Sequence, residues 1–315
     1  MNILLLGAAG FIGTNLTRKL AEDPNNKITL VDVNKNYFLP DVRLENVSIL
    51  ENAMGENADF CSLLQGQEVV YHLVSTTVPT TSNEQVANEL TANVVMTARL
   101  LDACVACNVQ KVIFISSGGT VYGKESQCPL AEDTATNPIS SYGIQKVTIE
   151  KLLYLYHYMH GLDYRVVRLA NPYGPYQRPN GILGAVTTFT YKALNREPIT
   201  VFGDGSVVRD FIYIDDAVRG ILSIANGESC HKVFNLGSGY GTSIRQVLEQ
   251  VQSALQIPLD IQWVEGRKVD VPINYLDISR YEEAFGPLNP ICLQEGICKT
   301  AEFMIRSGMC HKKEG

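Results

Sequence analysis

Residues 2–13, Asn-Ile-Leu-Leu-Leu-Gly-Ala-Ala-Gly-Phe-Ile-Gly, decide how this chain is expected to fold. The apolar run that ends at Gly7 is typical of a strand buried on both faces. The residues after Gly10 have helical spacing and place four apolar side chains on one face: Phe11, Ile12, Leu16 and Leu20. Glycines at 7, 10 and 13 allow a tight turn, a close approach of backbone to a pyrophosphate and close helix–sheet packing. The segment therefore predicts a strand–turn–helix unit that binds a dinucleotide at the helix N-terminus, with a purely structural glycine turn as the alternative.

An acidic residue closes the second apolar run, Ile28-Thr-Leu-Val-Asp32, and lies 19 residues after Gly13. In dinucleotide-binding folds a carboxylate at this place binds the ribose hydroxyls of the adenosine half. Its negative charge would also repel the 2′-phosphate of NADP. Asp32 therefore favours NAD as the cofactor, a preference that the nearby Lys35 weakens.

A tyrosine and a lysine four residues apart, Tyr142 and Lys146, follow about 130 residues downstream of the glycines. On a helix these two side chains share one face. A phenol with an ordinary pKa near ~10 is a poor base at neutral pH. A neighbouring ammonium and a bound nicotinamide cation would both favour the phenolate. The pair therefore predicts a general base beside a hydride acceptor, which the oxidation of an alcohol requires.

The composition excludes several other classes of protein. The chain has 315 residues, of which 45% are hydrophobic and 19% charged, as is ordinary for a soluble globular enzyme. A net charge of −7 argues against a nucleic-acid surface, and no apolar run approaches the ~18 residues of a membrane span. No basic stretch precedes the first strand, so we expect no cleaved signal, a cytoplasmic location and reduced thiols. Cys104-Val-Ala-Cys107 lacks a second ligand pair, so no metal site is predicted.

Strand-like and helical runs alternate along the chain. The strand-like runs are 2–6, 28–32, 47–50, 69–74, 111–117 and 164–169, and the helical runs are 11–22, 86–107 and 142–160, with later ones near 182–194, 215–226, 243–255 and 292–307. This alternation indicates an α/β fold, a Rossmann-type doubly wound parallel sheet with helices on both faces. We expect residues 1–170 to form an NAD-binding domain, to which residues 211–237 return. Residues 171–315 would mainly form a smaller α/β substrate-binding lobe.

Further motifs, in order along nearly the whole chain, resemble those of the extended short-chain dehydrogenase/reductase superfamily, and within it the NAD-dependent epimerase/dehydratase family and the UDP-sugar 4-epimerases. Besides Gly7–Gly13, Asp32 and the tyrosine–lysine pair, the matching segments are Asn93-Val94, Ser116–Gly123, Arg168–Pro175, Phe202–Gly205, Arg209–Phe211 and Asn235–Gly237. The resemblance implies an enzyme that oxidises and re-reduces C4 of a UDP-sugar through a 4-keto intermediate. It also implies a homodimer formed by the helices at 86–107 and 142–160.

The resemblance also assigns roles to individual residues. The residues it places at NAD are Gly7, Gly10, Phe11, Ile12, Gly13, Asp32, Asn52, Asn93, Ser116, Tyr142 and Lys146. Those it places at the sugar nucleotide are Thr120, Asn171, Phe202, Arg209, Arg267, Asp270 and Asn274. Arg209 and Arg267 would bind the diphosphate, for which guanidinium groups are well suited. Phe202 would stack on the pyrimidine, unless it is a plain core residue. Asn274 would line the pocket near the sugar 2-substituent, unless Tyr275 fills that space.

Three positions depart from the family pattern. Gly118 stands where a serine or threonine often bonds the reacting sugar oxygen, so Ser117 or Thr120 would replace that hydroxyl, with Thr120 preferred. Asn52 stands where an acidic residue often contacts the adenine. Val269 replaces the glycine that usually precedes the acid corresponding to Asp270, which steers an arginine or binds the nucleotide.

Other activities stay open at this point. A dehydratase relative would carry Asp-Glu at Gly118-Gly119, where this chain has no acid–base pair. A decarboxylase or a reductase of 4-keto sugars shares the remaining motifs. A catalytically inactive NAD-sensing protein is the alternative from another class, although such relatives usually lack the tyrosine or the lysine. The sequence alone does not name the sugar.

Overall fold

The structure, a computed structural model, describes residues 1–52, 55, 58–77, 82–124, 127–179, 184–266 and 271–310. The chain divides into two compact units. Unit 1 consists of Met1–Gly123, Ala135–Arg168 and Ile221–Phe234, and unit 2 consists of Lys124–Thr134, Leu169–Gly220 and Asn235–Gly315. The chain therefore passes between the units several times, whereas the sequence suggested a division near residue 170 and one return at residues 211–237. Of the segment 211–237, residues 221–234 belong to unit 1.

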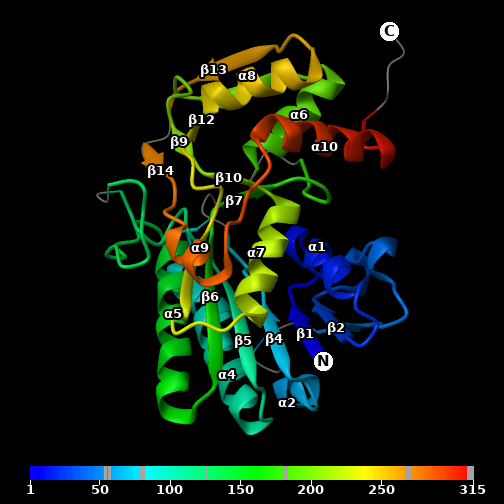
Figure 1. The fold of residues 1–315 in the computed structure, drawn as a ribbon, viewed down its shortest axis with the longest axis vertical. Helices are drawn as coiled ribbons and strands as arrows, with labels where there is room; N and C mark the ends of the chain where they lie inside the picture. Colours follow the sequence, from blue (N-terminus) through cyan, green and yellow to red (C-terminus); the bar gives the residue numbers. More distant parts are fainter. Residues whose placement is uncertain are drawn as a thin grey trace. The chain divides into compact units, whose positions relative to one another are not determined.

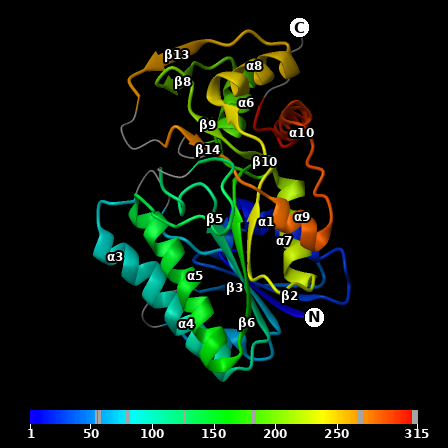
Figure 2. The same ribbon diagram turned by 60° about the vertical axis from the view of Figure 1, so that its left-hand side comes forward.

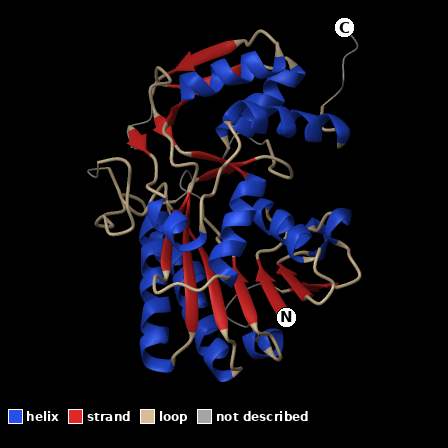
Figure 3. Ribbon diagram, viewed as in Figure 1, coloured by secondary structure: helices blue, strands red, loops and turns tan. Residues whose placement is uncertain are grey.

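Unit 1 is built on a seven-stranded sheet in the order β11-β6-β5-β4-β1-β2-β3 (Figures 1 and 3). The strands are β1 (Asn2–Leu6), β2 (Lys27–Asp32), β3 (Val47–Glu51), β4 (Val69–His72), β5 (Lys111–Ser117), β6 (Asp163–Leu169) and β11 (Val233–Leu236). The neighbours from β3 through β5 pair in parallel. The order β3-β2-β1-β4-β5-β6 is that of the doubly wound dinucleotide-binding fold. The predicted fold class is therefore confirmed.

Helices cover both faces of this sheet, because its central strand carries apolar side chains on both faces. Residues Ile3–Leu6 of β1 are completely buried, which is expected of a central strand in a sheet covered on both sides. The helices of unit 1 are α1 (Phe11–Leu20), α2 (Phe60–Leu64), α3 (Val86–Leu90), α4 (Met96–Ala106) and α5 (Ser141–His160). Helices α4 and α5 contact each other and lie side by side on one face (Figure 2).

Helix α5 carries the predicted tyrosine–lysine pair. The hydroxyl of Ser140 caps its N-terminus by accepting a hydrogen bond from the Gly143 N–H at 3.2 Å. The helix ends at Gly161, whose φ of 73° is left-handed. A Cβ added at Gly143 would lie 2.8 Å from the carbonyl oxygen of Thr120. A glycine at this position therefore lets the first turn of α5 pack closely against the loop that follows β5.

The single helix predicted for residues 86–107 is interrupted. Residues Thr91–Val95 form a π-helical turn between α3 and α4. Within it the Asn93 side chain donates a hydrogen bond to the Glu89 carbonyl, and the Thr97 hydroxyl donates to the Asn93 carbonyl. Side-chain bonds of this kind compete with the regular backbone ladder, and π turns of this type often mark functional sites.

Unit 2 contains three small sheets and a layer of helices. The sheets pair β7 (Asn171–Tyr173) with β10 (Phe211–Tyr213), β8 (Ile199–Phe202) with β13 (Ile261–Val264), and β9 (Val208–Arg209) with β12 (Thr242–Ser243) and β14 (Ile273–Asn274). Helices α6 (Ala185–Asn195), α8 (Ile244–Leu255) and α10 (Leu293–Arg306) contact one another. Helix α9 (Ser279–Phe285) also belongs to unit 2, and α7 (Ile214–Asn226) contributes residues to both units.

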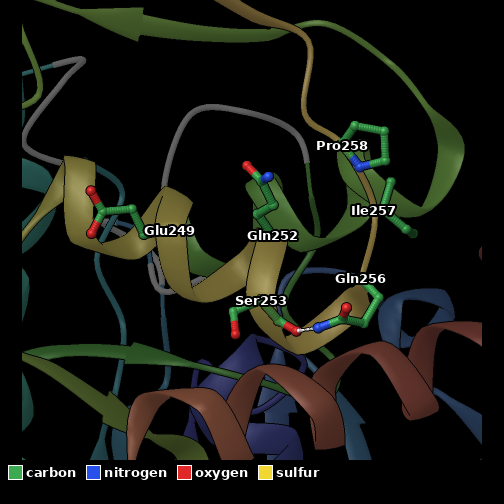
Figure 4. A pocket seen from close by; sticks show the side chains of 6 residues that line it. All are labelled: Glu249, Gln252, Ser253, Gln256, Ile257 and Pro258. Atoms are coloured by element: carbon green, nitrogen blue, oxygen red, sulfur yellow. Dashed lines mark hydrogen bonds between the residues drawn. The ribbon is translucent and has the colours of Figure 1, made fainter.

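A surface pocket lies at the C-terminal end of α8 (Figure 4). Its lining is mostly polar and contains none of the predicted site residues: Glu249, Gln252, Ser253, Gln256, Ile257 and Pro258. Gln256 donates a side-chain hydrogen bond to the Ser253 carbonyl at 2.6 Å. This hollow therefore plays no part in the site described below. Within the described ranges, the helices include none with the length and apolar character needed to cross a membrane.

Candidate active site

The glycine-rich loop between β1 and α1 has the geometry of a phosphate cradle. Gly7 has a φ of +76°, and a Cβ added to it would lie 3.0 Å from the backbone nitrogen of Val74. A Cβ added at Gly13 would lie 2.5 Å from the carbonyl oxygen of Ala8. Gly10 is the N-cap of α1 and has no side chain to bond the first-turn N–H groups. The loop therefore leaves the positive end of α1 open to an anion such as a pyrophosphate.

Asp32 lies beside this loop at the carboxyl end of β2. One carboxylate oxygen accepts a hydrogen bond from the Ala9 N–H at 2.9 Å, and the other accepts from the Val33 N–H at 2.8 Å. Asn52, the first residue after β3, donates its backbone N–H to the Asp32 carbonyl at 3.0 Å. Asp32 and Asn52 thus lie together at the edge of the sheet where the glycine loop begins. These residues fit the adenosine half of a dinucleotide.

The tyrosine–lysine pair lies at the carboxyl end of β5. The Lys146 ammonium donates a hydrogen bond to the carbonyl of Ile115 at 2.9 Å and lies 5.5 Å from the centroid of the Tyr142 ring. At the end of β5, the Ser117 side chain interacts with the Tyr142 phenol. Helix α5 and strand β5 therefore bring three predicted catalytic residues together: Ser117, Tyr142 and Lys146.

The pKa values of the pair differ from the expectation that the Lys146 ammonium by itself favours the Tyr142 phenolate. Burial raises the pKa of Tyr142 to about 12, although the bond with Ser117 opposes this rise. Burial lowers the pKa of Lys146 to about 8, although the carboxylate of Glu150 opposes this fall. Desolvation thus outweighs the attraction within the pair. A further positive charge next to Tyr142, such as an oxidised nicotinamide, is needed to make it a base at neutral pH.

The two hydroxyls considered as replacements at Gly118 have different surroundings. Thr120 Oγ1 is covered by protein and makes no hydrogen bond within the described part of the chain. Ser117 is partly exposed and interacts with Tyr142. Ser117 is therefore the hydroxyl that this structure presents next to the tyrosine.

Two residues expected at the cofactor use their side chains within the protein. The Asn93 amide accepts from the Thr76 N–H and donates to Gln145 Oε1 at 2.8 Å, among other partners. The Ser116 hydroxyl donates to Glu150 at 2.5 Å. Both side chains support the helix and strand that carry the catalytic pair.

A buried polar network that sequence reasoning missed surrounds the first turn of α5. The Glu89 carboxylate accepts hydrogen bonds from the Ser141 hydroxyl at 2.5 Å and from the Gln145 amide at 3.1 Å. The bond from Ser141 keeps the pKa of Glu89 below its usual range. Gln145 lies within the tyrosine–lysine motif itself, and its spacing of four residues from Ser141 was the signal that could have placed both on one inward face of the helix.

In unit 2 the predicted nucleotide-binding residues gather around β9. Arg209 is directly opposite Asn274 in the parallel pairing of β9 with β14. The Arg209 guanidinium donates to the carbonyls of Val208 and Val271 at 2.8 and 2.6 Å. Asn171 donates its side-chain amide to the Asp210 carbonyl at 2.8 Å.

The other nucleotide residues have distinct surroundings. Phe202 ends β8 and is 42% exposed. Asn274 is only 2% exposed. Arg267 and Asp270 lie outside the described residues.

The chain belongs to the NAD-dependent epimerase/dehydratase family, whose model matches residues 3–237. NAD is therefore its cofactor, in agreement with the glycine cradle and Asp32.

The chain is similar over its whole length to sugar-nucleotide epimerases. It is 34% identical to the UDP-glucose 4-epimerase of Mycolicibacterium smegmatis, over 96% of this chain and 98% of that protein. A crystal structure of the UDP-glucose 4-epimerase of Thermotoga maritima with UDP-glucose has a TM-score of 0.90 at 32% identity, covering 98% of this chain and 99% of that one. The UDP-N-acetylglucosamine 4-epimerase of Methanobrevibacter ruminantium M1, in complex with UDP-N-acetylmuramic acid, has a TM-score of 0.89 at 27% identity, covering 97% and 98%.

Proposed function

We propose that the protein is an NAD-dependent epimerase that inverts C4 of a UDP-sugar. The observation that carries this proposal is the grouping of Ser117, Tyr142 and Lys146, in which Lys146 lies one helical turn beyond Tyr142 on α5 and donates to the Ile115 carbonyl at the end of β5. This group can remove a proton from a secondary alcohol and return it. Similarity to UDP-sugar 4-epimerases over nearly the whole chain supports the choice of substrate class.

The residues of the chain would share the work as follows. Tyr142 takes the proton of the sugar 4-hydroxyl and later returns it, while Ser117 orients the reacting oxygen. Lys146 supplies positive charge beside the phenol. Bound NAD supplies a hydride acceptor that can return the hydride to the opposite face of C4. Gly7, Gly10, Gly13 and Asp32 bind the cofactor, and the side chains of unit 2 bind the nucleotide, with Arg209 at the diphosphate.

Incubation of purified protein with a panel of sugar nucleotides tests the proposal. The panel contains UDP-glucose, UDP-galactose, UDP-N-acetylglucosamine and UDP-glucuronic acid, and the readout is NMR of the products. We expect the 4-epimer of at least one UDP-sugar to accumulate to equilibrium. Elimination products in place of epimers would assign the protein to the dehydratases, and NAD binding without turnover of any sugar nucleotide would favour a sensor.

The lack of an acid–base pair after Ser117 weighs against a dehydratase. The two residues that follow it are Gly118 and Gly119, neither of which can transfer a proton. A Cβ at Gly119 would lie 3.9 Å from Ser117 Oγ, so the backbone there has ordinary space for a side chain. Elimination of a sugar hydroxyl would therefore need a catalyst from elsewhere in the site.

Asp32 leads to a prediction about the choice of cofactor. We expect the wild-type protein to bind NAD more tightly than NADP, because the carboxylate repels a 2′-phosphate. The protein would also retain NAD through purification, since the hydride is returned in each cycle. Calorimetric titration of both cofactors measures the preference. Equal affinities for NAD and NADP would contradict this role of Asp32.

Asn274 leads to a prediction about the sugar. We propose that this small amide leaves room for an N-acetyl group, whose oxygen it could bond. Asn274→Tyr should lower kcat/KM for UDP-N-acetylglucosamine relative to UDP-glucose. Because Asn274 is buried, thermal unfolding must accompany the kinetics. Tyr275→Ala is the matched variant, because Tyr275 is partly exposed. If the ratio of the two kcat/KM values changes only in Tyr275→Ala, then Tyr275 and not Asn274 selects the sugar.

The surface of α5 supports the proposed homodimer. Several large apolar side chains on this helix are exposed: Ile144, Tyr154, Leu155, Tyr158 and Met159. Val86 and Val95 add to the exposed apolar surface on the helical segment that packs beside it. An isologous interface through these helices would cover them. Light scattering at micromolar concentration should give the mass of a dimer, and Tyr158→Glu should shift it toward the monomer.

A further inference from the structure

Three successive residues of β5 contact three residues of α5 that are one helical turn apart. The carbonyl of Ile115 accepts from Lys146, the hydroxyl of Ser116 donates to Glu150, and Ser117 interacts with Tyr142. Tyr142, Lys146 and Glu150 thus form one row on the inner face of α5. The first two members are the catalytic pair, and the third is a carboxylate with no role in the reaction proposed above.

Glu150 is held in a single orientation. Its side chain is 4% exposed, and the guanidinium of Arg168 on β6 donates to both carboxylate oxygens. The shortest of these bonds, from Arg168 Nη2, measures 2.7 Å. Arg168 in turn donates to the Tyr122 hydroxyl at 3.0 Å, and its guanidinium lies 5.0 Å from the Tyr122 ring centroid. The carboxylate therefore links α5 to both β5 and β6.

The described groups around Lys146 come from α5 and from strands β4, β5 and β6. On α5 it is flanked by the neutral phenol of Tyr142 and by Glu150, and its ammonium lies 4.7 Å from the centroid of the Phe114 ring. His72 on β4 is buried, and its pKa is lowered to about 3 by burial and by Lys146, so it is neutral. On β6, Arg168 faces Glu150 and remains protonated. Glu150 is therefore the anion that opposes the cost of burying the Lys146 charge.

We propose that Glu150 is a positioning residue for Lys146: its carboxylate fixes α5 on the sheet and supplies the negative charge that keeps the lysine an ammonium. In the proposed epimerase this charge is needed next to Tyr142 during proton transfer. Loss of the Glu150 charge would leave the lysine neutral at a lower pH. The alkaline limb of the pH profile of turnover would then move to a lower pH.

Glu150→Gln, which preserves size and shape, tests the proposal by two measurements. The first is the titration of Lys146, followed by NMR of protein with ¹³C-labelled lysine and assigned by the signal missing from Lys146→Met. The second is the pH dependence of kcat. We expect the titration midpoint and the alkaline limb of the profile to move about one pH unit or more toward acid. An unchanged midpoint would overturn the proposal.

Two further variants separate charge from packing. Ser116→Ala removes one hydrogen bond and keeps the carboxylate, so the Lys146 midpoint should stay near that of the wild type. Glu150→Asp keeps the charge but withdraws it by one methylene, and should give a smaller shift in the same direction. If Glu150→Gln does not fold, Glu150→Asp decides, and a wild-type midpoint in that variant would overturn the proposal.

The kinetic measurement rests on the proposed function, whereas the titration does not. A wild-type protein that turns over no UDP-sugar would refute the epimerase assignment. The titration of Lys146 would still decide the role of Glu150.

Discussion

Tyr142→Phe should lower kcat at least about 100-fold, the low end of what a general acid–base residue contributes. The substitution removes the hydroxyl that exchanges a proton with the substrate in the proposed mechanism and keeps the ring. The fold should be preserved, because the pKa of Tyr142 is raised by burial and its phenol is therefore uncharged in the free protein. NAD affinity should also be preserved, because the glycine cradle and Asp32 do not contact this hydroxyl.

Single-turnover and steady-state assays, together with NAD titration and thermal unfolding, measure these expectations. Ser117→Ala is the matched variant, since it removes the partner hydroxyl and leaves the phenol. Ser117→Ala should lower kcat less than Tyr142→Phe does. Turnover near the wild-type rate in Tyr142→Phe would remove this residue from the mechanism.

Lys146→Met should also lower kcat at least about 100-fold, yet leave the protein as stable as the wild type or more so. Methionine replaces the buried methylenes of lysine and removes the charge. In the folded protein burial lowers the pKa of Lys146 to about 8, against an ordinary value of 10.5. At pH 7 the buried ammonium therefore costs up to about 3 kcal/mol relative to the unfolded chain, part of which the lost bond to Ile115 offsets.

The second prediction also states the direction in which the free energy of unfolding changes with pH. Between about pH 8 and pH 10.5 the unfolded chain keeps the Lys146 proton while the folded protein releases it. The free energy of unfolding of the wild type should thus gain a contribution as pH rises through this window. Denaturant unfolding of wild type and Lys146→Met across the window measures the difference. A difference that does not depend on pH would show that Lys146 is not the group that titrates.

The sequence alone determined the features that depend on local spacing. The glycines of residues 2–13 and the carboxylate at Asp32 identified a dinucleotide fold, because turn geometry and strand length fix where these residues fall. The sheet is of the predicted doubly wound class, and its first six strands fall within one or two residues of their expected positions. The four-residue spacing of Tyr142 and Lys146 fixed their common face on α5 for the same reason.

The tertiary structure decided which side chains reach the reacting groups and which are used to hold the site together. Asn93 and Ser116 match family motifs at NAD, but their side chains bond to Gln145 and Glu150, which are far away in sequence. The choice between Thr120 and Ser117 could not be settled from sequence, because it depends on which hydroxyl the loop after β5 covers.

The protonation states of the site residues likewise depend on the tertiary structure. A sequence shows that Lys146 can be an ammonium, but only burial against β5 lowers its pKa, and only the packing of β6 brings Arg168 onto Glu150. Electrostatic energies depend on solvent exposure and on distances between separate strands and helices. Local spacing therefore predicted the fold and the candidate catalytic pair, whereas the protonation state of that pair and its support depend on long-range packing.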